Sequence, residues 1–217
     1  MTSRKPVNSE LKPVDIGDLL DRIKDRQSKA RKYQENIGKF SLTEAQIGEL
    51  LSRINDLRDY TLIQLAVTTG IRREDIVSIE VKDVDLKRQL VTFHEQKKSR
   101  SWSAYLWGDS PVTLERYLKT IDRRERFLFP GRSARIPSKT HLTGRAAYDI
   151  LQKWLGAASL EERPFHALRS SCMKMLLRKG WTIEQVMRQT GDTAEVIQEH
   201  YTIPSDSEMT ELARRTR

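Results

Sequence analysis

The sequence contains one cysteine and no long apolar run. Cys172 has no second cysteine to pair with, so an intramolecular disulfide is excluded and a buried structural thiol is expected. No segment approaches the roughly 18 consecutive apolar residues of a transmembrane helix. The N-terminal stretch MTSRKPVNSELKPVD lacks the apolar core of a signal peptide. We therefore expect a protein of a reducing intracellular compartment without a membrane-spanning segment.

Histidine is also scarce, and its distribution does not indicate a metal site. His94, His141, His166 and His200 are widely separated, and Cys172 completes no ligand spacing with them. Zinc sites bring their Cys and His ligands in closely spaced pairs. The sequence therefore predicts no metal centre.

Positive charge, in contrast, is abundant and unevenly distributed. The 39 Lys and Arg exceed the 30 Asp and Glu, which gives a net charge of +9. From Lys119 to Arg145, eight basic residues accompany only two acidic ones. Such a cluster favours a polyanionic partner, nucleic acid first and an anionic membrane second. The candidate phosphate contacts are Arg123, Arg124, Arg126, Arg132, Arg135, Lys139 and Arg145.

The pattern of apolar residues predicts a short N-terminal arm followed by one domain. Residues 1–38 carry few apolar anchors, so we expect an arm or a lone helix there and the domain over 39–217. Segments 81–96 and 101–107 alternate in polarity and are rich in β-branched and aromatic residues, which predicts strands. Helical spacing predicts helices over 40–54, 59–70, 72–79, 110–121, 144–158, 163–180, 181–191, 193–202 and 205–215. The predicted fold is mainly α with a small antiparallel β-sheet, an α+β class.

Capping and turn signals predict where several of these elements begin and end. Ser41 with Glu44, and Ser205 with Glu208, match the capping box of a helix start. Gly70 is expected to end the second helix. The turn between the two longer strands is expected to contain Lys97, Lys98, Ser99 and Arg100.

The helix predicted over 163–180 begins with His166 and Arg169. Residues three apart share one face of a helix, so both side chains are expected to project together from the first turns. Arg supplies a rigid fork of donors, and His supplies a donor that can also move a proton, so the pair can grip an anion. A surface pair that only caps the helix is the alternative.

Four segments, in this order, resemble the catalytic domain of the tyrosine recombinases, also called the phage integrase family. TTGIRREDI contains Arg72 and Asp75, EQKKSR places a lysine in a hairpin turn, HALR contains His166 and Arg169, and EHYTIP contains Tyr201. The ordered set covers residues 39–217. It implies the fold of that catalytic domain and site-specific DNA recombination or integration.

The resemblance also implies a chemistry that needs neither a metal ion nor ATP nor another cofactor. The two arginines would hold the non-bridging oxygens of a DNA phosphate, and His166 would hydrogen-bond the same phosphate. Tyr201 would attack phosphorus and form a 3′-phosphotyrosine link. A turn lysine would protonate the leaving 5′-oxygen. Counting back from Leu106 favours Lys97 for this role, whereas a strand bulge would favour Lys98.

The remaining implications concern supporting residues and assembly. Asp75 is expected to support an active-site arginine. The implied partners are double-stranded DNA and further copies of the chain, a tetramer in the synaptic complex, linked through the helix predicted over 205–215. No membrane partner is implied. The implied location is cytoplasmic, nucleoid-associated in a prokaryotic host or with the gene carried by a virus or plasmid.

Asp192 departs from the pattern of the resemblance. It lies nine residues before Tyr201, where the family commonly has His or Trp. A carboxylate cannot donate a hydrogen bond to a phosphate and is expected to repel it, which predicts a slow enzyme. With Glu195 three residues later, Asp192 also matches the N-cap of the helix predicted over 193–202, a purely structural explanation.

Two alternative functions stay open. A relaxase similar to type IB topoisomerases would share the fold and the cleavage step but act as a monomer without site preference. A non-catalytic DNA-binding protein could have retained the fold. Asp192 favours this second alternative, as does a front segment, 1–38, too short for the DNA-clamping domain that many family members carry.

Overall fold

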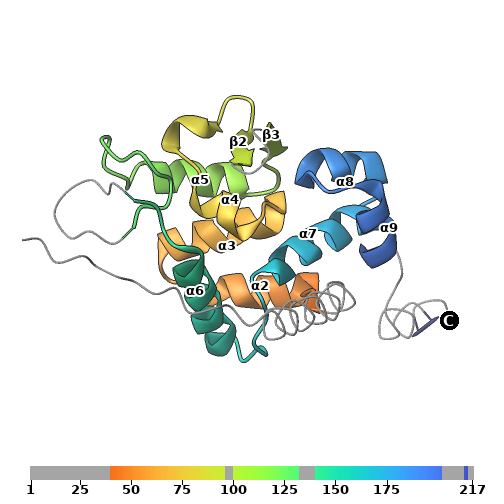
Figure 1. Ribbon diagram of the computed structural model, residues 1–217. Coiled ribbons are helices and arrows are strands. Elements are labelled where there is room, and N and C mark those ends of the chain that lie inside the picture. The colour runs from red at the N-terminus through yellow and green to blue at the C-terminus, as the bar shows by residue number, and fades with distance from the viewer. Residues whose placement is uncertain (1–39, 96–99, 132–139, 202–212, 215–217) are drawn as a thin grey trace, which may run out of the picture. The chain divides into compact units, whose positions relative to one another are not determined.

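The computed structural model describes residues 40–95, 100–131, 140–201 and 213–214 (Figure 1). These residues belong to the unit Ile37–Arg217, the second of two compact units in the chain. The predicted arm over 1–38 lies outside the described residues. So does the predicted last helix over 205–215, except for the helical residues 213–214.

Two helices precede the first predicted site residue, Arg72, and a third helix follows it. α2 spans Glu44–Ser52, α3 spans Leu57–Thr69 and α4 spans Arg73–Val77. Every residue from Thr61 to Thr69 is buried, because α3 runs through the centre of the core. α3 ends where predicted, at Gly70, whose left-handed backbone (φ 65°) suits glycine.

The start of α2 differs from the prediction. Thr43, and not Ser41, is the N-cap: its hydroxyl accepts a hydrogen bond from the Gln46 backbone N–H (3.2 Å). The Gln46 side chain accepts one in return from the Thr43 backbone N–H (2.9 Å). Glu44, the predicted second member of the box, is already the first residue of the helix. Both Ser41-x-x-Glu44 and Thr43-x-x-Gln46 match the sequence pattern, and the structure forms the later box.

The three strands form one antiparallel sheet in the order β1-β2-β3, which confirms the predicted small antiparallel sheet. β1 spans Val84–Asp85, β2 spans Leu90–Glu95 and β3 spans Arg100–Tyr105. Val91 pairs with Ala104, and all three of Val91, Phe93 and Ala104 are buried, so alternate positions of the ladder face the core.

The turn of this hairpin is shorter than predicted. Arg100 was expected in the turn, but it begins β3 and pairs with Glu95. The connecting segment is therefore 96–99. Lys97 and Lys98 fall in it, and both lie outside the described residues.

Two further helices complete the main core. α5 spans Ser110–Leu118 and α6 spans Gly144–Ala157. One apolar cluster joins α5 and α6 to α2, α3 and the sheet. Its buried members include Leu62, Leu114, Phe129, Leu151 and Leu155.

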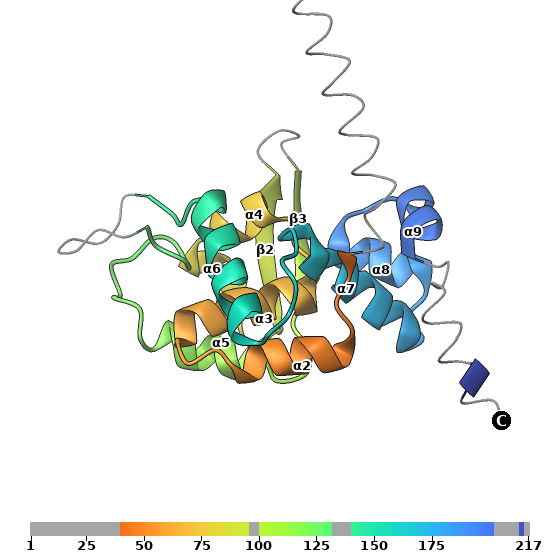
Figure 2. The ribbon, with the colours of Figure 1, turned by 90° about the horizontal axis from the view of Figure 1, so that it is seen from below.

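The last three helices lie together on the side of α3 opposite α5 and α6 (Figures 1 and 2). α7 spans His166–Arg178, α8 spans Ile183–Thr190 and α9 spans Ala194–Tyr201. They share a smaller apolar cluster of Cys172, Met173, Leu176, Val186 and Ile197. The fold is thus mainly helical with one small antiparallel sheet, which confirms the predicted class.

Within the described ranges, no helix combines the length and the apolar character needed to cross a bilayer. The same part of the chain holds no group of three side chains suited to bind a metal ion.

Candidate active site

The site lies where two helix ends of the same construction abut. α3 ends in Thr69-Gly70 and α8 ends in Thr190-Gly191, with both glycines left-handed (φ 65° and 74°). In each turn the Thr hydroxyl donates to the carbonyl four residues earlier: Thr69 to Leu65 (2.5 Å) and Thr190 to Val186 (2.9 Å).

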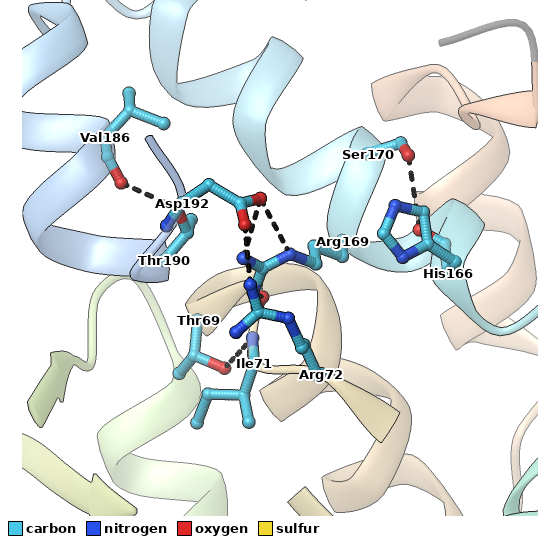
Figure 3. Close-up of polar contacts among 10 residues, drawn as sticks. Thr69, Ile71, Arg72, His166, Arg169, Ser170, Val186, Thr190 and Asp192 are labelled. Atoms are coloured by element: carbon cyan, nitrogen blue, oxygen red, sulfur yellow. Dashed lines mark hydrogen bonds and ion pairs between the residues drawn. The ribbon is translucent and has the colours of Figure 1, made fainter. Parts of the chain in front are cut away.

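Each of these hydroxyls also accepts a hydrogen bond from the backbone N–H two residues ahead. The donors are Ile71 and Asp192, each at 3.4 Å (Figure 3). A Cβ on Gly70 would come within 2.9 Å of Thr190 Cγ2 and 3.2 Å of Cys172 Sγ. The two turns and α7 are therefore packed too closely for a side chain at Gly70.

The first turn delivers Arg72. It is the N-cap residue of α4, and its side chain is 37% exposed. Its Nη2 donates to Oδ1 of Asp192 at 2.8 Å. Its Nη1 is buried and has no hydrogen-bond partner among the described residues. Arg72 therefore combines one charge-assisted contact with one buried nitrogen that has no acceptor among the described residues.

Arg169 comes from α7 and is almost completely buried, with its side chain 2% exposed. Its Nη1 donates to the Gly70 carbonyl. Its Nε and Nη2 both reach Oδ2 of Asp192, at 3.1 Å and 2.7 Å. Arg169 is thus held at the first turn by a backbone oxygen and at the second turn by a carboxylate.

Asp192 joins the two arginines (Figure 3). Its side chain is 11% exposed, and each carboxylate oxygen contacts a different guanidinium group. The predicted N-cap role is wrong. α9 begins at Ala194, and the Ile197 N–H donates to the Thr193 carbonyl (3.1 Å), which puts Thr193 at the capping position. The carboxylate is free of the helix end and neutralises part of the positive charge instead.

His166 is the first residue of α7, so the structure places it on the same helix as Arg169, as predicted. Its carbonyl accepts a hydrogen bond from the Ser170 hydroxyl (3.3 Å). Figure 3 shows His166 next to Ser170 on α7, the helix that also carries Arg169.

The other predicted catalytic positions are described only in part. Tyr201 is the last residue of α9, and its side chain lies outside the described atoms. Lys97 and Lys98 lie outside the described residues altogether. Asp75 lies in the first turn of α4, where its N–H donates to the Arg72 carbonyl (3.0 Å). The Arg72 guanidinium contacts Asp192, and its support by Asp75 stays a prediction.

The predicted phosphate-facing run is partly neutralised by acidic side chains. Exposed ion pairs join Arg124 to Asp122 (2.8 Å), Arg126 to Glu80 (2.8 Å) and Arg145 to Asp149 (3.0 Å). The hydrogen bond from Arg126, with a second from Lys82, lowers the pKa of Glu80 to about 2. Arg123 is exposed and forms no ion pair within the described ranges. Arg132, Arg135 and Lys139 lie outside those ranges.

Gln189 is a positioning residue that the sequence did not single out. Its side-chain oxygen accepts from the Tyr105 N–H (2.9 Å), and its nitrogen donates to the Tyr105 carbonyl (2.8 Å). The amide thus extends the hydrogen bonding of β3 and fixes α8, and with it the Thr190-Gly191-Asp192 turn, against the sheet. In the sequence, the only local sign of this role is a glutamine near the end of a predicted helix.

These features bring two arginines onto one carboxylate, with His166 on the same helix as Arg169 and Tyr201 at the end of α9. The sequence profile described as the Phage integrase family matches residues 41–208. The chain therefore belongs to the phage integrase family, the tyrosine recombinases.

Individual relatives agree with this assignment. The integrase of Salmonella phage P22 is 24% identical over 162 residues, which cover 71% of this chain and 41% of the integrase. The tyrosine recombinase XerA of Pyrococcus horikoshii is 24% identical over 151 residues, 70% of this chain and 52% of XerA. The chain thus spans about half the length of these curated relatives.

Solved structures show the same fold. A crystal structure of XerA recombinase superposes with a TM-score of 0.68 at 21% identity, over 82% of this chain and 65% of XerA. The XerH site-specific recombinase bound to its difH substrate gives a TM-score of 0.63 at 19% identity, over 80% of this chain and 52% of XerH.

Proposed function

We propose that this protein cleaves and rejoins DNA strands at specific sites through a 3′-phosphotyrosine intermediate. The observation that carries the proposal is the convergence of Arg72 and Arg169 on the two oxygens of one anionic group. A phosphodiester also presents two anionic oxygens on one atom, and arginine forks bind such pairs well.

The proposed chemistry distributes the steps over five side chains. Tyr201 gives its hydroxyl proton to His166 as its Oη attacks phosphorus, the P–Oη bond forms and the bond to the 5′-oxygen breaks. Lys97, or Lys98 in its place, gives the proton that the leaving 5′-oxygen takes up. Arg72, Arg169 and His166 stabilise the negative charge of the phosphorane-like transition state. Attack by a 5′-hydroxyl on the phosphotyrosine reverses these bond changes, so rejoining needs no ATP.

Double-stranded DNA is the proposed partner. The net charge of +9 supports it, as does the XerH relative, whose structure is described as bound to the difH substrate. Strand exchange joins two DNA duplexes, so we also propose that several copies of the chain, four in a synaptic complex, act together.

A covalent-trapping experiment tests the proposal. Nicked duplexes from a random-sequence pool release a short strand on cleavage, so a phosphotyrosine adduct persists and is seen as protein–DNA on a denaturing gel. We expect adducts with wild type and Tyr105→Phe, and none with Tyr201→Phe, which lacks only the nucleophilic oxygen. Excess chelator should leave adduct formation unchanged, because arginines supply the charge that a metal ion would bring.

Other outcomes separate the alternatives. Adducts that persist in Tyr201→Phe would place the nucleophile elsewhere. DNA binding without any adduct in the wild type would favour the non-catalytic alternative. Relaxation of supercoiled plasmid by a monomer without sequence preference would favour the relaxase.

A further inference from the structure

The Asp192 carboxylate has the arrangement that a bound phosphate would have. Oδ1 lies 2.8 Å from Arg72 Nη2, and Oδ2 lies 2.7 Å from Arg169 Nη2 and 3.1 Å from Arg169 Nε. The contacts of Arg72 Nη2 and Arg169 Nε are charge-assisted hydrogen bonds, and the contact of Arg169 Nη2 is an ion pair. Two guanidinium groups from distant parts of the chain thus share one anion, and that anion belongs to the protein itself.

The same arrangement closes the site to an external anion. The Arg169 side chain is 2% exposed and the Asp192 side chain 11% exposed. Two of the three Arg169 nitrogens contact Asp192, and the third contacts the Gly70 carbonyl. A DNA phosphate can reach this guanidinium only after the carboxylate has moved away.

The charges at the site also indicate that Asp192 must move before a phosphate binds. Two guanidinium groups and one carboxylate sum to +1 at the site. A phosphate placed on both arginines with Asp192 still in position would bring two anionic groups into contact, and like charges a few ångströms apart repel strongly in a partly buried site. The Arg72 side chain is 37% exposed, so a phosphate would enter the site from the side of Arg72.

The turn that carries Asp192 permits such a displacement. Asp192 follows the left-handed Gly191 and precedes α9, and its carboxylate does not cap that helix. Rotation of the side chain therefore breaks the contacts with the arginines without breaking a helix end. The backbone on the α8 side stays fixed by Thr190 and Gln189.

We propose that Asp192 is a built-in phosphate surrogate: in the DNA-free protein it pairs with Arg72 and Arg169, and an incoming phosphate must displace it. This rests on the proposed role of the two arginines in phosphate binding. Asp192 thus competes with the phosphate for the two arginines and lowers the affinity of the site for phosphate.

Binding of inorganic sulfate tests the proposal without DNA. Calorimetric titrations at constant ionic strength compare wild type, Asp192→Asn and Glu49→Gln. Glu49 lies in an exposed ion pair with Arg53 on α2, so this control removes a carboxylate charge elsewhere. We expect Asp192→Asn to bind sulfate at least about tenfold more tightly than wild type, and Glu49→Gln to match wild type. Adding Arg72→Ala to Asp192→Asn should abolish the gain.

A second variant covers a loss of stability in Asp192→Asn, which leaves Arg169 buried without its counterion. Asp192→His is titrated in parallel. If sulfate raises the melting temperature of either variant more than that of wild type, this also counts as tighter sulfate binding. Equal or weaker sulfate binding by both folded variants overturns the proposal.

The adduct assay keeps this proposal distinct from the proposed function. A gain in sulfate binding with no DNA adduct in any variant supports the surrogate role and contradicts the recombinase chemistry. Adducts in the wild type with no gain in sulfate binding contradict the surrogate role alone. Faster adduct formation by Asp192→Asn supports both.

Discussion

Asp192 shows how one residue can match a local pattern and serve another purpose. Its position before Thr193 and its spacing to Glu195 suggest an N-cap, and the helix would accept it there. In the structure α9 instead begins at Ala194, one residue later than predicted, and the Asp192 carboxylate pairs with Arg72 and Arg169. Neither arginine is near Asp192 in sequence, so no local rule could predict this pairing.

Cys172 is buried as predicted, and burial has a measurable consequence. Desolvation raises the pKa of its thiol to about 12. In the unfolded chain a thiol ionises near pH 8.5. Between these values the unfolded state has lost a proton that the folded state keeps, so the stability of the fold declines as the pH rises through this range.

We therefore expect Cys172 to be unreactive toward a thiol-specific disulfide reagent in the native protein at pH 8. One equivalent should react promptly in urea, because unfolding exposes the thiol and restores its ordinary pKa. Cys172→Ala serves as the control, and it should remove the part of the alkaline stability loss that the thiol causes. Rapid labelling under native conditions would show that α7 opens readily around this position.

At the scale of elements, the α8–α9 turn is positioned by the sheet. Gly191 has a φ of 74°, and a Cβ there would lie 2.4 Å from Trp102 Cζ2 on β3. Gln189 fixes the preceding turn of α8 to Tyr105. The strand β3 therefore positions the turn that carries Asp192.

Gly191→Ala should destabilise the protein by about 2 kcal/mol or more, from the left-handed backbone and the contact with Trp102. The matched control is Gly48→Ala in the middle of α2, where a Cβ meets nothing within 4 Å. There alanine should stabilise by about 0.5–1 kcal/mol. Urea unfolding measures both. A small effect of Gly191→Ala would mean that Trp102 and the turn separate easily.

At the scale of the whole molecule, charge governs the expected interaction with DNA. The formal charge is +9, but ion pairs with Asp122, Glu80 and Asp149 offset part of the basic run. The three arginine side chains are 67–80% exposed, so a DNA phosphate can reach them.

We expect DNA binding to weaken steeply with salt, because each neutralised phosphate releases counterions. Reversal of Arg123, Arg124 and Arg126 to Glu should flatten the slope of log K against log salt by roughly 2–3, at about 0.9 per lost phosphate contact. Arg53→Glu, at the exposed C-cap of α2, is the control and should change the slope less. A slope that the triple reversal leaves unaltered would show that this run does not contact DNA.

Much of this fold was predictable from the sequence, because the signals are local. The buried α3 and its end at Gly70, the amphipathic helices and the alternating strands follow from residue spacing. Errors arose where two local patterns overlapped. Ser41 and Thr43 both match the sequence pattern of a capping box, but only Thr43 forms one. Arg100 is compatible with a turn or with a strand, and it lies in β3.

The sequence by itself determined the order of the site residues and the family, since motif spacing along the chain carries that information. Tertiary structure alone decided how they meet. It brought the two Thr-Gly turns together, buried Arg169 and gave both arginines to Asp192, because these contacts join residues far apart in sequence. The sequence marks Asp192 as a departure from the family pattern and as an N-cap candidate. In the structure its carboxylate is the counterion of the arginine pair, because the fold places both guanidinium groups within 3 Å of it.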